Sequence, residues 1–265
     1  MTLIQSFLLG IIQGLTEFIP VSSTAHLLIG QSLLGIPADD AMFSFLVIVQ
    51  LGTIVSLIIF YWKDLLNLVK AFFAKPFSTE ENTLAWYIII ATIPALIAGY
   101  LLKDVVETLF KQPMTEASIR LFSAAILLAL AEALTKKSRN LNSMTWLDAL
   151  IVGLFQIIAV FPGASRSGST ISGGMFRGFD RPSAARFAFL MSVPVMLAAG
   201  GYQMLDVIKM PNLGEFLPLL AVGFVTAAIV GWFAIKWLIN YLSKHSLYVF
   251  AGYCAVVGAI VFFLK

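Results

Sequence analysis

Charged residues are scarce in this chain, and their scarcity excludes a soluble fold. Only 12% of the 265 residues are charged, 60% are hydrophobic, and the mean hydropathy is +0.94. Because a soluble domain carries about 25% charged residues, this chain could not cover a water-exposed surface of its size. Apolar runs recur along the whole sequence, so it predicts an all-α polytopic membrane protein with lipid as its solvent.

Cysteine and histidine are also rare. The single cysteine, Cys254, excludes an internal disulfide and a cysteine-based metal cluster, and two histidines in total exclude a histidine-rich metal site. The net charge of +3 comes with no visible basic face, so no nucleic-acid partner is expected. The sequence lacks a P-loop, a Cys-x5-Arg phosphatase motif and a Gly-x-Ser-x-Gly elbow. The first apolar run lacks the basic start and cleavage site of a signal peptide, so we expect it to be retained.

Six stretches are long and apolar enough to span a bilayer, which needs roughly 20 residues. They are residues 43–61, 84–102, 119–134, 187–206, 216–239 and 247–264. Two other apolar stretches, 3–19 and 146–161, run into polar loops containing proline and glycine and then resume as short helical pieces. We predict that residues 3–36 and 146–178 form two broken, re-entrant helices.

The two broken stretches resemble one another. Gly10 and Gln13 align with Gly153 and Gln156, and a cluster of proline and serine follows each pair. The sequence therefore predicts one membrane domain, 1–265, made of repeats 1–140 and 141–265, each a broken helix followed by three spans. An odd number of spans per repeat makes the second repeat inverted, with the site near the midplane where the broken helices meet.

The positive-inside rule gives an orientation for this topology. About 11 Lys and Arg residues fall on one side and 5 on the other, with Arg166 left out at a loop tip. The richer side is expected to be cytoplasmic, so both termini are predicted to lie outside.

A first polar cluster follows the first broken stretch. It consists of Gln13, Glu17, Ser22, Ser23, Thr24 and His26. Gln13 and Glu17 are four residues apart and share a helix face, while Ser23 and His26 are three apart and can meet if a helix restarts after Pro20. An acid beside a histidine in an apolar region is costly, which indicates a functional site. The alternative is a surface loop in which the serines only cap a helix and the histidine is solvated.

A second cluster follows the second broken stretch. It consists of Pro162, Gly163, Ser165, Arg166, Ser167, Gly168, Ser169 and Thr170. Hydroxyls surround one arginine, and no acid lies nearby to neutralise it. Phosphate would supply the missing charge, because a guanidinium binds phosphate oxygens bidentately. The alternative is a cytoplasmic arginine that only obeys the positive-inside rule, which explains the charge but not the hydroxyls.

These two clusters resemble the motifs of one family. The runs Gln13–His26 and Pro162–Gly174 are similar, in order and separation, to the first and second motifs of the undecaprenyl-diphosphate phosphatase (bacitracin-resistance) family, and the similarity covers essentially the whole chain. The resemblance implies an enzyme of the bacterial inner membrane that releases inorganic phosphate from undecaprenyl diphosphate. That reaction recycles the carrier lipid for cell-wall synthesis and confers bacitracin resistance.

The resemblance also implies roles for the clustered residues. Ser23 is the expected nucleophile, with His26 or Glu17 as its base, and attack by a water that Glu17 activates is the alternative. Arg166 is the expected catalytic cation. Further phosphate contacts are expected from Ser22, Thr24, Gly163, Ser165, Ser167 and Thr170. A divalent cation, Mg²⁺ or Ca²⁺, is expected at Glu17 and Gln13, where the amide of Gln13 replaces the carboxylate that the family pattern also permits.

A transporter or flippase for lipids with a phosphate headgroup is the rival function, because paired broken helices are typical of transporters. A structural scaffold would leave Glu17, His26 and Arg166 unexplained. The oligomeric state is not specified, and a homodimer is one option. We predict that Glu17, Ser23, His26 and Arg166 converge in one pocket, although the clusters are about 140 residues apart.

Overall fold

The protein is a bundle of helices. The computed structural model describes residues 1–102, 113–160 and 165–264, and this part of the chain contains helices, turns and one isolated bridge but no strand. The helices are α1 (Leu3–Thr16), α2 (Ser23–Leu33), α3 (Asp40–Phe60), α4 (Trp62–Phe72), α5 (Glu80–Leu101), α7 (Pro113–Leu134), the 3-10 turn η1 (Leu141–Ser143), α8 (Trp146–Val160), α9 (Arg166–Phe176), α10 (Arg181–Val207), α11 (Leu213–Leu242) and α12 (Tyr248–Leu264).

Polar side chains define where several of these helices begin. The hydroxyl or carboxylate of Thr2, Asp39, Thr79, Ser165 and Asp180 accepts a hydrogen bond from a backbone N–H in the first turn of α1, α3, α5, α9 and α10. These N–H groups have no partner inside the helix, and in a lipid environment they cannot be left unsatisfied.

Five of the six predicted spans are confirmed as helices long and apolar enough to cross a membrane. They are Asp40–Phe60, Glu80–Leu101, Met114–Leu134, Arg181–Val207 and Leu213–Leu242. The stretch predicted at 247–264 forms α12, an apolar helix of 17 residues, which is shorter than these five. The chain is therefore a polytopic membrane protein.

The helix boundaries differ from the sequence prediction in two places. Helix α10 begins at Arg181, earlier than predicted, because the carboxylate of Asp180 accepts from the N–H of Ser183 at 2.7 Å and Pro182 favours the first helical turn. Helix α4 was not predicted. Its polar side carries Lys63, Asp64 and Lys70, and these charges interrupt the apolar pattern on which the prediction of spans depends.

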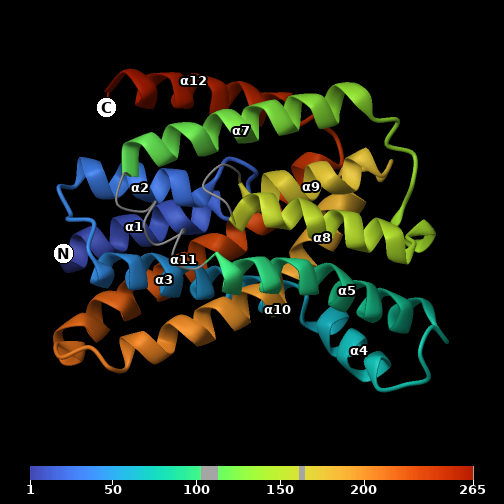
Figure 1. Ribbon diagram of the computed structural model, residues 1–265, viewed down its shortest axis with the longest axis horizontal. Coiled ribbons are helices and arrows are strands. Elements are labelled where there is room, and N and C mark those ends of the chain that lie inside the picture. Colours follow the sequence, from blue (N-terminus) through green and yellow to red (C-terminus); the bar gives the residue numbers. More distant parts are fainter. Residues whose placement is uncertain (103–112, 161–164, 265) are drawn as a thin grey trace.

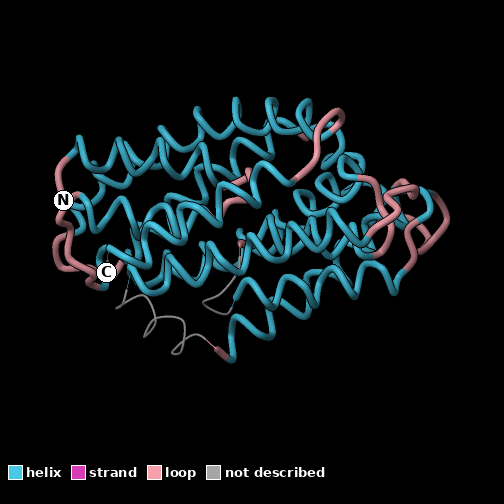
Figure 2. Tube along the Cα trace, turned by 90° about the horizontal axis from the view of Figure 1, so that it is seen from above, coloured by secondary structure: helices cyan, strands magenta, loops and turns pink. Residues whose placement is uncertain are grey.

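Both stretches predicted to be broken form two consecutive helices. Residues 3–36 contain α1 and α2, separated by the turn 17–22, and residues 146–178 contain α8 and α9. Helices α1 and α2 lie in the half of the molecule that carries both termini, and α8 and α9 lie in the other half (Figure 1). Figure 2 also places the N- and C-terminal ends of the chain at the same end.

The helix contacts repeat between the two halves of the chain. Helix α1 packs on α11 as α8 packs on α5, and α3 packs on α11 as α5 packs on α10. The aligned glycines serve the same purpose in both halves: a Cβ on Gly10 would lie 2.7 Å from the carbonyl oxygen of Gly223, and a Cβ on Gly153 would lie 2.5 Å from that of Ala91. Each glycine therefore permits a close approach of two backbones.

Two groups of ion pairs join the loops between the halves. The buried carboxylate of Asp148 accepts from Arg139 and Arg177, and the buried carboxylate of Glu132 pairs with Lys137 and Arg181. These contacts fasten the α7–α8 connection to the turn between α9 and α10. Helix α7 also contacts both α2 and α9, so it holds the two broken regions against one another.

Candidate active site

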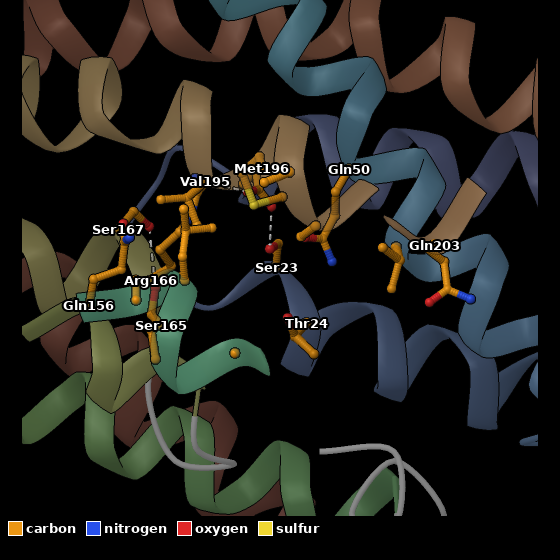
Figure 3. A pocket seen from close by; sticks show the side chains of 18 of the residues that line it. Ser23, Thr24, Gln50, Gln156, Ser165, Arg166, Ser167, Val195, Met196 and Gln203 are labelled. Carbon is orange, nitrogen blue, oxygen red and sulfur yellow. Dashed lines mark hydrogen bonds and ion pairs between the residues drawn. The ribbon is translucent and has the colours of Figure 1, made fainter. Parts of the chain in front are cut away.

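A cavity of about 490 Å³ lies where the two broken regions meet (Figure 3). Its polar wall comes from the turn 17–22 and the start of α2, from α8, and from the start of α9. Its other wall is mostly apolar and comes from α3, α5 and α10. The residues of that second wall are Phe43, Val47, Gln50, Ala95, Leu96, Gly99, Tyr100, Val195, Met196, Ala198, Ala199, Tyr202 and Gln203. The cavity therefore combines a polar end with an apolar surface.

Glu17 lies at the centre of the polar wall. Its Oε1 forms an ion pair with Nη2 of Arg166, although 149 residues separate the two in sequence. Its Oε2 accepts from the hydroxyl of Ser23 at 2.5 Å and from Nε2 of Gln13 at 2.7 Å. The expectation that no acid neutralises Arg166 is therefore wrong, because the acid comes from the other half of the chain.

The turn that carries Ser23 has an unusual backbone. Ser22 has a positive φ of 68°, a conformation that costs a non-glycine residue free energy. Its N–H donates to the hydroxyl of Ser165 at 3.2 Å, and its own hydroxyl accepts from the N–H of Ala25 at 3.4 Å. These bonds hold Ser23 at the first position of α2, where its hydroxyl reaches Glu17.

The start of α9 contributes hydroxyls to the same cavity. Ser165 caps α9 by accepting from the N–H of Gly168 at 3.1 Å, and its hydroxyl lies 3.2 Å from that of Ser167. Both serines line the cavity. Thr170 does not line it, and its hydroxyl donates to the backbone carbonyl of Arg166 at 2.8 Å. Gly163, predicted to contact phosphate, lies outside the described residues.

His26 is placed differently from the other predicted catalytic residues. Its Nδ1 lies 2.9 Å from the carbonyl oxygen of Ser22, and its Nε2 lies 2.8 Å from the hydroxyl of Tyr253 on α12. Because a carbonyl only accepts, Nδ1 carries a proton, and in the neutral ring Nε2 accepts from Tyr253. The histidine is not among the residues that line the cavity, and the hydroxyl of Ser23 bonds to Glu17 instead.

Of the other predicted site residues, Thr24 lines the cavity, and Gln13 is fully buried behind Glu17. The Oε1 of Gln13 has no hydrogen-bond partner in the part of the chain that the structure describes. No group of three or more His, Cys, Asp or Glu side chains within the described part of the chain could hold a metal ion by itself. A cation at this position would therefore depend on Glu17, Gln13 and a ligand.

Several cavity residues were not predicted to be functional. Gln50, Arg120, Gln156 and Gln203 all line it. Gln156 had one sequence signal, its alignment with Gln13 in the repeat. Arg120 gave none, because its pairing with Glu116 on α7, at 2.6 Å, resembles an ordinary helical ion pair.

The arrangement provides a hydroxyl bonded to a carboxylate, with a guanidinium beside both. The carboxylate can take the proton of the hydroxyl, and the guanidinium can bind an anion next to it. Nη1 of Arg166 is buried and has no partner in the structure, so the guanidinium keeps a donor beyond its bond to Glu17. This combination suits the transfer of an anionic group such as phosphoryl.

The chain is similar to known bacterial proteins along nearly its whole length. The family model described as bacitracin resistance protein BacA matches residues 6–260. The undecaprenyl-diphosphatase of Chloroherpeton thalassium is 41% identical, over 97% of this chain and 95% of that protein. The undecaprenyl-diphosphatases of Rubrobacter xylanophilus and Mycobacterium ulcerans are 40% and 39% identical, each over 98% of this chain, and over 97% and 95% of their own lengths. The chain therefore belongs to the bacitracin resistance protein BacA family.

Proposed function

We propose that this protein hydrolyses undecaprenyl diphosphate to undecaprenyl phosphate and inorganic phosphate. The observation that carries the proposal is the contact of Ser23, Glu17 and Arg166 at the polar end of a cavity whose remaining wall is apolar. A polyprenyl diphosphate has the same two-part character. Its headgroup would lie against Arg166 and its chain against the apolar residues of α3, α5 and α10. The names of the relatives support this substrate.

In the proposed reaction, Ser23 attacks the terminal phosphorus as its proton passes to Oε2 of Glu17. The bond from that phosphorus to the bridging oxygen breaks, and undecaprenyl phosphate leaves with the proton from Glu17, which becomes a carboxylate again. Water, deprotonated by Glu17, then attacks the phosphoserine, which releases inorganic phosphate and restores Ser23. Direct attack by water on the diphosphate, with Glu17 as base, is the alternative. Arg166 stabilises the transferring group in both routes.

The geometry favours Glu17 over His26 as the base. Ser23 donates its hydroxyl proton toward Glu17, whereas His26 is occupied by Ser22 and Tyr253. His26 then acts as a positioning residue, because its bond to the Ser22 carbonyl supports the strained turn before Ser23. Phosphate contacts are proposed for Ser165, Ser167, Ser22 and Thr24, which line the cavity, whereas Thr170 supports the turn of α9.

A divalent cation, Mg²⁺ or Ca²⁺, fits the same site. The unpartnered Oε1 of Gln13 and the carboxylate of Glu17 are oxygen ligands of the kind these ions prefer, and the diphosphate would supply the others. Bound there, the ion would neutralise part of the negative charge of the substrate. Because Gln13 is uncharged, Glu17 alone supplies negative charge in this pair. We therefore expect the ion to bind weakly before the substrate binds.

In the membrane, we propose six spans, with α12 as the sixth, and re-entrant pairs α1–α2 and α8–α9 related as an inverted repeat. The shared contact pattern of the two halves and the placement of both termini at one end support this arrangement. The excess of Lys and Arg at the opposite end supports the proposal that this end faces the cytoplasm of the bacterial inner membrane and the termini lie outside. Reporter fusions at the C-terminus test this, and a signal there from a cytoplasm-only reporter would reverse the orientation.

The repeated contact pattern also favours a second candidate, transport of a lipid with a phosphate headgroup. The same cavity could hold such a headgroup without cleaving it. The two functions differ in a direct assay. A transporter moves labelled lipid between the leaflets of a vesicle and releases no phosphate, whereas the proposed hydrolase releases phosphate in detergent, where there are no leaflets.

The test of the hydrolase is phosphate release from undecaprenyl diphosphate by the purified protein in detergent. We expect turnover by the unaltered protein and a loss in Ser23→Ala as large as that in Arg166→Ala. A phosphoserine trapped by rapid acid quench would establish the covalent route. Measurable turnover in Ser23→Ala would favour direct attack by water, and no release from well-folded unaltered protein would refute the function.

A further inference from the structure

Gln156 is a buried amide that the structure leaves without a partner. It lies on α8, is 2% exposed and lines the cavity. Neither its Nε2 nor its Oε1 has a hydrogen-bond partner within residues 1–102, 113–160 and 165–264. Figure 3 shows it on the same side of the cavity as Ser165, Arg166 and Ser167.

Other buried glutamines of this protein have partners. Nε2 of Gln203 donates to the hydroxyl of Ser44 at 3.0 Å, that of Gln13 to Glu17, and that of Gln31 to the carbonyl of Ile36. An unsatisfied buried amide costs stability, and among the buried glutamines that the structure describes Gln156 is the one whose amide nitrogen and oxygen both lack a partner. Among the described residues on this side of the cavity, Nη1 of Arg166 is also a free donor, and the two can serve one anionic ligand.

The repeat explains why Gln156 is free. Gln156 aligns with Gln13, and four residues after Gln13 comes Glu17, whose carboxylate accepts from its amide. Four residues after Gln156 the sequence has Val160, which offers no such acceptor. The second half of the chain thus keeps the amide of the first half but lacks the carboxylate that would occupy it.

We propose that Gln156 is a substrate-binding residue whose Nε2 donates to a phosphate oxygen of the prenyl diphosphate, alongside Nη1 of Arg166. The inference rests on the proposed function, which supplies the diphosphate. A diphosphate carries many acceptor oxygens, so it can satisfy both donors at once. A neutral amide adds a donor without a second buried cation, which would lack a counterion until substrate arrives.

The test compares Gln156→Leu with the unaltered protein in two assays. The first is the KM and kcat for undecaprenyl diphosphate. The second is the affinity for a prenyl methylenediphosphonate, whose P–C–P bridge is not hydrolysed. Loss of a hydrogen bond to a charged oxygen should lower kcat/KM and the affinity by about ten- to a hundredfold. Because the amide is unsatisfied in the free protein, Gln156→Leu should not lower the Tm. If Gln156 had only a structural role, the same substitution would lower the Tm.

Ser172→Ala is the matched control. The hydroxyl of Ser172 is also buried and unpartnered, but Ser172 does not line the cavity, so its loss should leave the affinity unchanged. Gln156→Glu should bind the diphosphonate more weakly than Gln156→Leu, because a carboxylate repels it. If Gln156→Leu does not fold, Gln156→Met, which is unbranched, serves in its place.

The outcomes separate the two proposals. An affinity for the diphosphonate within about twofold of the unaltered protein, in a well-folded Gln156→Leu, overturns the role of Gln156 and leaves the hydrolase standing. If the unaltered protein binds the diphosphonate through Gln156 but releases no phosphate, the inference stands as a binding site and the hydrolase fails.

Discussion

The helix pairs α1–α2 and α8–α9 make matching contacts with other helices but provide opposite chemistry. The α1–α2 turn and the start of α2 contribute an acid and the hydroxyl bonded to it, Glu17 and Ser23, while the start of α9 contributes the arginine and the serines beside it. Gly10 in α1 and Gly153 in α8 each permit a close approach to a neighbouring helix, which is α11 for α1 and α5 for α8. Two helix pairs with matching contacts can therefore carry different polar residues while their packing stays the same.

The two turns also differ in how well their polar groups are satisfied. Both oxygens of Glu17 accept hydrogen bonds, and Ser23 donates to one of them. In α8 and α9, both amide atoms of Gln156 and Nη1 of Arg166 have no partner among the described residues. Glu17 and Ser23 are thus arranged in advance, as the proposed chemistry requires, and α8 and α9 keep donors free, as binding of the diphosphate requires.

The largest expected effect comes from removing the acid of the first turn. Glu17→Gln should lower phosphate release by at least about a thousandfold, because both proposed routes need its carboxylate as base. The fold should persist, since an amide fills the same space. The exposed Glu215→Gln is the control and should be silent. Near-normal turnover in Glu17→Gln would remove the catalytic role of the first turn and favour transport.

Removing the cation of the second turn should come next. Arg166→Ala should lower kcat by about a hundred- to a thousandfold, because it removes the charge that stabilises the transferring phosphoryl group. Arg166→Lys keeps the charge but loses the planar fork, so it should retain only a small part of the activity. Both are measured at matched amounts of folded protein. If lysine restores full activity, the fork and its free Nη1 do not matter.

A smaller effect on kcat is expected at His26, whose Nδ1 donates to the carbonyl of Ser22 in the turn before Ser23. His26→Ala should lower kcat by about tenfold, as expected for a lost positioning contact. His26→Asn should recover most of this loss, because the asparagine amide can donate to the Ser22 carbonyl as Nδ1 does. Equal and severe losses in both variants would make His26 the base, in place of Glu17.

The smallest effect on turnover is expected where the two halves are alike. Gly10→Ala and Gly153→Ala each place a Cβ within 2.7 Å of a backbone oxygen on the partner helix. Each should destabilise the protein by about 1–3 kcal/mol, which is typical of overpacking. The two should lower the Tm by similar amounts and leave kcat nearly unchanged at permissive temperature. A loss confined to one glycine would show that the halves are not equivalent in packing.

Much of the fold can be predicted from the sequence, because the average hydrophobicity of a long stretch depends only on which residues that stretch contains. Five of the predicted spans are helices of the required length, and both stretches with Pro and Gly form two helices. The prediction missed α4, because its charged residues lower the average hydrophobicity of that stretch. It placed the start of α10 too late, because the cap that begins this helix is the single residue Asp180, which an average over many residues does not detect. The functional motifs were visible because polar clusters in apolar sequence are costly.

The partners of those motif residues were decided only by the tertiary structure. Nothing near Arg166 in sequence indicates that its acid is Glu17, because the pairing requires α7 and the other helices to hold the two turns together. The spacing of Ser23 and His26 predicted a contact, yet the positive φ of Ser22 turns the hydroxyl of Ser23 toward Glu17, and the histidine bonds to Tyr253. Spacing along a helix shows which residues can meet, but the packing of distant segments decides which of them do.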